Sequence, residues 1–151
     1  MRSCITAFVT CLVVALGMVG VAVAEDGGRP LSTAMTGAEE APGPGDPNAT
    51  GQADLTLNQG QQRVCFTISW ADIDGTVFAA HIHVAPPGSP GPIVVPLFTG
   101  SFAGTDSTSG CVENVDADLI KAIRHDPSAY YVNVHSMPNF PNGAIRGQLG
   151  D

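Results

Sequence analysis

The chain has 151 residues and a formal net charge of −8, from 6 Lys and Arg against 14 Asp and Glu. This length suits one domain and is marginal for two. The acidic balance argues against nucleic acid and anionic membranes as partners, and it is an unfavourable field for capturing an anionic substrate.

The first 24 residues predict a secretory signal peptide. A short basic start at Arg2 precedes an uncharged run to Ala24, which ends in Ala22-Val23-Ala24 before Glu25. A retained signal anchor is the alternative, because about 20 apolar residues can just span a bilayer. The small residues at the exit favour cleavage, so we expect a secreted, periplasmic or cell-envelope protein that is free of the membrane after cleavage. Residues 25–30 are expected to form a disordered lead-in, and residues 31–151 one β-domain.

Two cysteines remain after cleavage, Cys65 and Cys111. In an oxidising compartment an even pair indicates one disulfide. Buried thiols or a thiolate metal site are alternatives, but the Cys-x-x-Cys spacing typical of such sites is missing. We therefore predict a Cys65–Cys111 disulfide.

Short alternating segments dominate the rest of the chain and predict β-strands. The expected strands are residues 31–36, 52–57, 63–70, 77–84, 93–98, 111–115, 130–136 and 144–149. The second and third of these form a hairpin, and Asn142-Gly143 marks a turn before the last. Residues 116–125 form the one expected helix, with Asp116 as its cap and His125 at its basic C-terminal end. The predicted fold is an all-β, antiparallel Greek-key β-sandwich or barrel of about eight strands with one short helix.

Three of the four histidines lie in predicted strands. His81 and His83 are two residues apart, so they point to one face of their strand, and Asn133 and His135 have the same spacing in a later strand. If these strands are neighbours, three imidazoles converge and can bind copper, zinc or nickel with a position left open. Copper fits a redox role better than zinc, which does not change oxidation state. His125 is explained by its place at a helix end and is not a predicted ligand.

Four separated motifs carry a family resemblance. They are Ala80-His81-Ile82-His83, Gly91-Pro92, Tyr131-Val132-Asn133-Val134-His135 and Ile145-Arg146-Gly147-Gln148-Leu149. In this order the chain resembles the CHRD domain, named after chordin, over about residues 31–150. The resemblance implies an extracellular or cell-envelope β-domain. Ala144 departs from the acidic residue expected before the Ile-Arg-Gly-Gln segment.

A weaker similarity of pattern is to copper-zinc superoxide dismutase, although in that family both cysteines follow the His-x-His strand. This resemblance implies copper ligands at His81, His83 and His135, and a catalytic Arg146 that holds a small anionic oxidant such as superoxide. Asn133 or a backbone carbonyl would fix a histidine tautomer from behind the ligands. The competing hypothesis is a non-catalytic extracellular binding module, in which the histidines are structural and Arg146 binds buried carbonyls.

Overall fold

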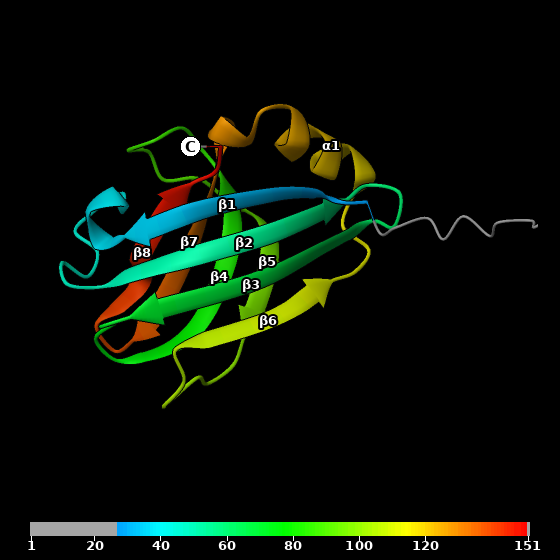
Figure 1. Cartoon of the computed structure of the whole chain (residues 1–151). Helices are drawn as coiled ribbons and strands as arrows, with labels where there is room; N and C mark the ends of the chain where they lie inside the picture. The colour runs from blue at the N-terminus through cyan, green and yellow to red at the C-terminus, as the bar shows by residue number, and fades with distance from the viewer. Residues whose placement is uncertain (1–26, 151) are drawn as a thin grey trace, which may run out of the picture.

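A computed structural model describes residues 27–150, which fold into one antiparallel β-sheet curled into a nearly closed barrel (Figure 1). The strands are β1 (Arg29–Thr36), β2 (Thr50–Asn58), β3 (Arg63–Ala71), β4 (Thr76–Val84), β5 (Ile93–Thr99), β6 (Ser107–Val112), β7 (Tyr130–Met137) and β8 (Phe140–Gln148). Helix α1 (Ala117–His125) and two single-turn helices, η1 (Gly37–Glu39) and η2 (Pro127–Ala129), complete the described elements. The prediction of an all-β, antiparallel fold with about eight strands and one short helix is confirmed. The predicted signal peptide, residues 1–24, lies outside the described residues.

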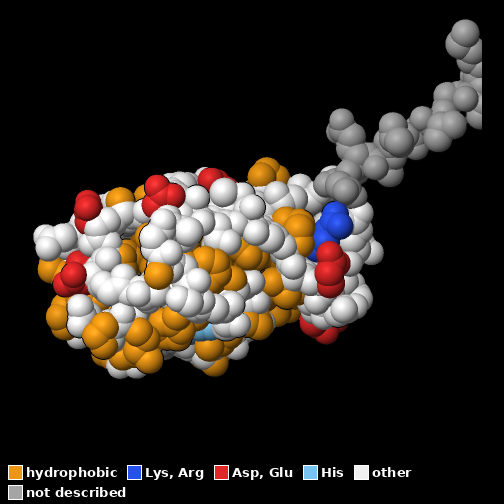
Figure 2. All heavy atoms as spheres, turned by 90° about the horizontal axis from the view of Figure 1, so that it is seen from below, with side chains coloured by type: hydrophobic (Ala, Val, Ile, Leu, Met, Phe, Trp, Pro, Cys, Tyr) orange, Lys and Arg blue, Asp and Glu red, His pale blue; other side chains and the backbone are white. Residues whose placement is uncertain are grey.

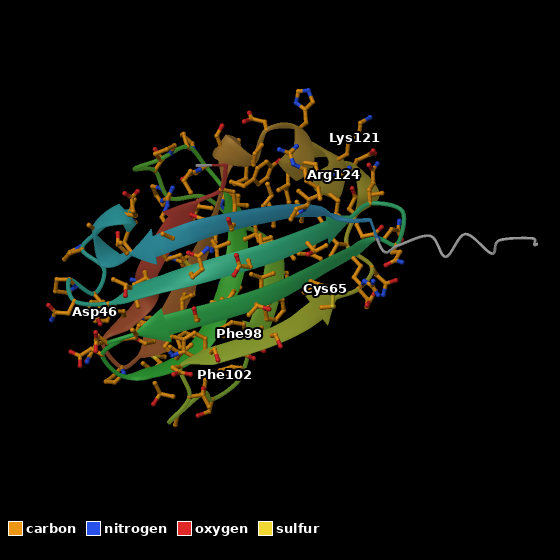
Figure 3. The ribbon with its side chains drawn as sticks, in the orientation of Figure 1. Asp46, Cys65, Phe98, Phe102, Lys121 and Arg124 are labelled. Carbon is orange, nitrogen blue, oxygen red and sulfur yellow. A yellow bond between two sulfur atoms is a disulfide. The ribbon has the colours of Figure 1, made fainter. Side chains whose placement is uncertain are left out.

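The order of the strands in the sheet is β5-β4-β7-β8-β1-β2-β3-β6. The predicted hairpin is present as β2 and β3, and β6 pairs with the other edge of β3. This pairing sets Cys65 directly opposite Cys111, and the two form the predicted disulfide (Figure 3). The link therefore joins two neighbouring strands.

The barrel interior is filled by alternate residues of the strands. Fully buried examples are Leu57, Ile68, Ile82, Val132 and Ile145. At the open seam of the sheet, Phe98 of β5 packs against Phe66 and Trp70 of β3, with ring centroids 5.9 and 6.1 Å apart. These aromatic contacts hold the β5 edge against the β3–β6 side of the sheet.

Helix α1 covers one end of the barrel through an apolar stripe that includes Ile120 and Ile123, both fully buried. Its start is fixed as the sequence predicts, because the Asp116 carboxylate accepts hydrogen bonds from the backbone N–H groups of Asp118 and Leu119. None of the helices in residues 27–150 is long and apolar enough to cross a membrane.

Several predicted strand boundaries are wrong, and those of β1, β2, β6 and β8 differ by two residues or more. Strand β1 begins at Arg29 instead of 31, because Arg29 and Pro30 already pair with β2. Strand β6 spans Ser107–Val112 instead of 111–115, so a Ser- and Thr-rich stretch of low apolar content is paired by its neighbour β3.

Strand β8 begins at Phe140 instead of 144. The turn between β7 and β8 is at Pro138-Asn139, and Asn142-Gly143 lies inside the strand. A shift in the β7–β8 register between Val134 and Ser136 accommodates this segment, where Gly143 has a φ of 143°.

Candidate metal centre

The outer face of β4, β7 and β8 carries a group of polar side chains. Register pairs His81 with Asn133 and Asn133 with Arg146, so these three lie in a row across the sheet. The next row is formed by His83, Tyr131 and Gln148. Because strand side chains alternate, the intervening residues point into the core and the polar ones point outward. The structure thus makes the two histidine strands neighbours.

Loops cover this outer face and bury it. Strand β7 is buried at seven of its eight positions, which requires cover on both sides. The exposed fractions are 8% for His83, 7% for His135 and 1% for Arg146, whereas His81 is only partly buried. Viewed from below, the molecule shows a small histidine surface among hydrophobic and uncharged atoms, with acidic side chains towards the edges of this face (Figure 2). Most of the polar group is therefore withdrawn from water, and its members need internal partners.

Backbone carbonyls fix two of the histidine rings. Nδ1 of His83 lies 2.9 Å from the carbonyl oxygen of Gly91, and Nδ1 of His135 lies 3.0 Å from that of Pro141. A carbonyl oxygen only accepts, so each Nδ1 carries the proton and each Nε2 keeps its lone pair. Carbonyl bonds of this kind orient histidine ligands in metal sites.

The three imidazoles converge. One ring nitrogen from each of His81, His83 and His135 can be chosen so that all lie within 4.8 Å of one another. Nδ1 of His81 is 3.0 Å from Nε2 of His135, and Nε2 of His83 is buried with no hydrogen-bond partner. Metal–nitrogen bonds of about 2.0–2.1 Å place adjacent ligand atoms about 3 Å apart and opposite ones about 4 Å apart. The widest nitrogen pair must therefore close by roughly 0.7–1.5 Å, depending on the coordination geometry, before all three bind one ion.

Burial lowers the pKa of all three histidines. For His81 the pKa falls to about 4, with burial as the main cause and the neighbouring His135 and His83 adding to it. Burial is also the largest cause for His83 and His135, partly opposed by their hydrogen bonds to Gly91 and Pro141. At neutral pH the three rings are uncharged, which is the form that binds metal ions. Because Nε2 of His135 has the lone pair, Nδ1 of His81 donates the hydrogen bond between these two rings, and its proton must move to Nε2 of His81 before Nδ1 can bind a metal ion.

Arg146 lies in the same surface but points its guanidinium into a loop. Its Nη atoms donate hydrogen bonds to the carbonyl oxygens of Ser89 and Pro86 and to the side chain of Gln148, at 2.8, 3.1 and 3.0 Å. The guanidinium carbon also lies 3.5 Å from the centre of the Tyr131 ring. The residue predicted to hold an anion is thus buried, and these contacts are with the protein itself.

Asn133 contacts a carboxylate, which the sequence did not single out. Its side-chain N–H donates to Glu40, which reaches the outer face from the segment after η1. The segment is held by Asp46 (Figure 3), whose carboxylate accepts from the backbone N–H groups of Asn48 and Asp74. No hydrogen bond of Asn133 to a histidine ring is present in the described residues, so the carbonyls of Gly91 and Pro141 occupy the supporting role considered for it.

Glu40 has an unusual environment for an acid. Burial raises its pKa from 4.5 to about 7, against the positive charge of Arg146 and the hydrogen bond from Asn133, which lower it. The sequence offers only two adjacent acids before a proline-rich loop, a pattern that is usually solvated. The contact between Glu40 and Asn133 therefore depends on the tertiary structure and has no signal in the local sequence.

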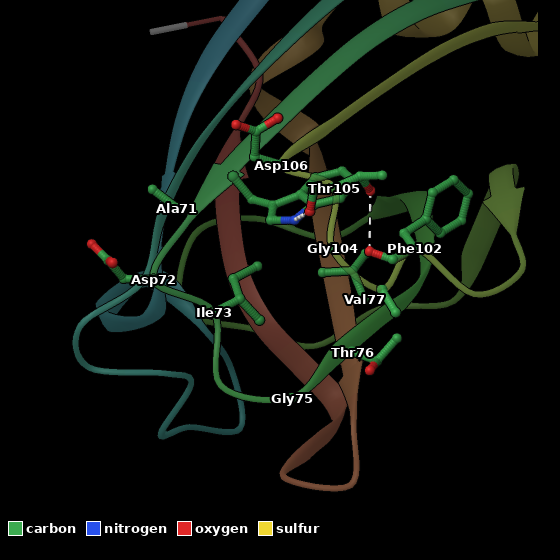
Figure 4. Close-up of a pocket in the computed structure, with 12 residues that line it drawn as sticks. Ala71, Asp72, Ile73, Gly75, Thr76, Val77, Phe102, Gly104, Thr105 and Asp106 are labelled. Carbon is green, nitrogen blue, oxygen red and sulfur yellow. Dashed lines mark hydrogen bonds between the residues drawn. The ribbon is translucent and has the colours of Figure 1, made fainter.

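A separate cavity of about 280 Å³ lies between the β3–β4 turn and the β5–β6 loop (Figure 4). Trp70, Val77 and Phe102 line it, and the Trp70 indole N–H donates to the Thr105 carbonyl oxygen at 3.1 Å. None of the histidines is among its lining residues. His125 lies at the end of α1 and is outside the histidine group.

Fold and site together define a small antiparallel β-barrel domain with three convergent imidazoles on its outer face. The family model of the CHRD domain matches residues 31–149, and the chain belongs to this family. The resemblance seen in the four motifs is thereby confirmed. Comparisons with curated proteins and with solved structures gave no significant match.

Proposed function

We propose that this CHRD domain is exported and binds one copper ion through His81, His83 and His135. The observation that carries the proposal is the convergence of three ring nitrogens within 4.8 Å. It is supported by the hydrogen bonds from Nδ1 of His83 and of His135 to backbone carbonyls, which leave a lone pair on Nε2 of both rings. At His135 a metal ion would replace the hydrogen bond that Nε2 accepts from His81. The Cys65–Cys111 disulfide is compatible with export, because such links persist in oxidising compartments.

Copper is preferred to zinc because nitrogen ligands bind divalent copper more tightly. The group contains three neutral imidazoles and no acidic residue of the described chain. Divalent copper binds nitrogen ligands more tightly than zinc or nickel at a given site. Zinc remains the second choice, because three imidazoles with one open position also suit it.

Copper at this site would supply one-electron chemistry, for which superoxide dismutation is the proposed reaction. Two superoxide ions and two protons give dioxygen and hydrogen peroxide, one superoxide being oxidised and the other reduced. The partial exposure of His81 supports access for a small oxidant. The net charge of −8 opposes the approach of an anion. Arg146, whose charge helps to lower the pKa of His83, is only 1% exposed.

The test begins with metal analysis of protein purified without added metal, followed by copper titration against a competing chelator. We expect one copper per chain for the wild type and for His125→Ala, which alters a histidine outside the group. His81→Ala, His83→Ala and His135→Ala should each lose stoichiometric binding. Equal loss in all four variants, or no loss in any, would show that the copper is adventitious.

The reaction is tested separately with the copper-loaded protein. It should consume superoxide faster than the same amount of copper held by the chelator, and His135→Ala should abolish the difference. Stoichiometric copper without this activity would restrict the function to binding. Failure to bind any metal would favour the non-catalytic module, since the histidine–carbonyl contacts would then be purely structural.

A further inference from the structure

We infer that Arg146 is a positioning residue that determines which nitrogen of His83 faces the metal position. It does so through the Tyr131 ring and through residues 85–92, here called the cover loop. The inference rests on the proposed function only for its effect on metal binding. Its effect on the His83 ring is already present in the metal-free protein. It differs from the predicted role of Arg146 as a holder of anions.

The first contact is a stack of three planar groups. The rings of His83 and Tyr131 are nearly parallel, at 9°, with centroids 4.8 Å apart. The Arg146 guanidinium carbon lies 3.5 Å from the Tyr131 ring centre. Because β4 and β8 flank β7 on opposite sides, His83 and Arg146 lie on opposite faces of the phenol ring. The cation holds the phenol, and the phenol limits rotation of the imidazole.

The second contact runs through the cover loop. Arg146 donates to the carbonyl oxygens of Pro86 and Ser89, and Gln148 donates to that of Ala85 at 2.9 Å. These bonds hold the first half of the loop against β8.

Gly91, near the end of the same loop, forms hydrogen bonds with Tyr131 and His83. Its N–H donates to the Tyr131 hydroxyl at 3.2 Å, and its carbonyl oxygen accepts from Nδ1 of His83 at 2.9 Å. A side chain at Gly91 would collide with the Val84 carbonyl, so the loop packs closely here. Arg146 therefore acts at both ends of one hydrogen bond, on the ring that donates it and on the loop that accepts it.

The consequence is the protonation pattern of His83. With the Gly91 carbonyl in place, the proton stays on Nδ1 and the buried Nε2 has no hydrogen-bond partner. When the loop shifts, the ring can rotate, so that the other nitrogen faces His81 and His135, or its proton can move to Nε2, so that the nitrogen facing them has no lone pair. Arg146 itself is 1% exposed and satisfied by carbonyls, so it is poorly placed to capture an anion from solvent.

Arg146→Lys is the principal variant, because it keeps the charge and loses the planar fork that spans two carbonyls. Tyr131→Leu removes the stack without replacing a charged residue, and it serves if Arg146→Lys does not fold. Arg124→Lys on α1 is the matched control for the same chemical change away from the site. Thermal unfolding establishes that each variant is folded.

The decisive measurement is the nitrogen NMR spectrum of the His83 ring in the metal-free protein. We expect the Nδ1–H form alone in the wild type and in Arg124→Lys, and a mixture of the two forms in Arg146→Lys and Tyr131→Leu. A single Nδ1–H form in both site variants would overturn the inference. This result does not depend on copper, so its failure is distinct from a failure of the proposed function.

Copper binding provides the second measurement through a double-mutant cycle. Arg146→Lys should weaken copper affinity about tenfold and alter the electron paramagnetic resonance spectrum of Cu(II). In the His83→Ala background, where only the weaker binding by His81 and His135 is left to measure, the same change should weaken the affinity less than about twofold. An equal loss in both backgrounds would show that Arg146 acts independently of His83 and would contradict the inference.

Discussion

Replacing Glu40 with Gln should remove the loss of folding stability that ionisation of this side chain causes as the pH rises. Burial raises the pKa of Glu40 from 4.5 to about 7, so the folded protein holds this proton more tightly than the unfolded chain does. Protonation of Glu40 therefore favours folding, and its contribution is lost as the pH rises from about 4.5 through about 7. Gln keeps the acceptor for the Asn133 amide but cannot ionise.

The size of the effect follows from the two pKa values. Each pKa unit corresponds to about 1.4 kcal/mol, so ionised Glu40 costs the folded state about 3 kcal/mol at most. The partial exposure of this side chain reduces the figure, and we expect about 1–3 kcal/mol. Near pH 4.5 the two proteins should have similar stability, and at pH 8 the Gln variant should be the more stable.

The assay is urea denaturation of both metal-free proteins at several pH values between 4.5 and 8. The histidines titrate in the same range with the opposite sign, because their lowered pKa values cost stability as the pH falls below about 6.5. This contribution is common to both proteins and cancels in the difference. A difference that does not change with pH, or that grows towards low pH, would refute the assigned environment of Glu40.

Two further predictions concern the fold. Cys65→Ser with Cys111→Ser opens a link across 46 residues and should lower the free energy of unfolding by about 4 kcal/mol, measured by denaturation; an unchanged midpoint would refute this estimate. Gly143→Ala should destabilise the protein by roughly 1–3 kcal/mol more than Gly88→Ala. Both glycines have positive φ, but a Cβ at 143 lies 2.5 Å from Asn133 and Glu40, whereas one at 88 meets nothing within 4 Å. Equal thermal shifts for the pair would contradict this packing.

The sequence predicted correctly those helices and strands that are determined by residues close together in the chain. The helix at Asp116 has its cap, and the β2–β3 hairpin has alternating faces on both sides of a short connection. The alternation of His81 and His83 also predicted a shared face correctly. The same spacing of Asn133 and His135 predicted the later strand. The sequence left open whether the two strands are neighbours, and the structure pairs β4 with β7.

The contacts that loops make with the outer face could not be predicted from the sequence. Periodicity places Arg146 and Asn133 on the outer face, but it does not reveal that Pro86, Ser89 and Glu40 fold over them. The turn at Asn142-Gly143 was misplaced because a strong local turn signal is overridden by the register shift in β8. In both cases long-range packing decides the outcome.

The placement of the three imidazoles outside the barrel has a consequence for the order of events in the cell. His81 and His83 belong to β4, and His135 belongs to β7. Gly91 and Pro141, which orient two of the rings, come from the cover loop and from the start of β8. A chain threaded through a translocation channel has none of these parts together. If the protein is exported unfolded, a metal ion at the proposed site would bind only after export, and its identity would depend on the metals available there.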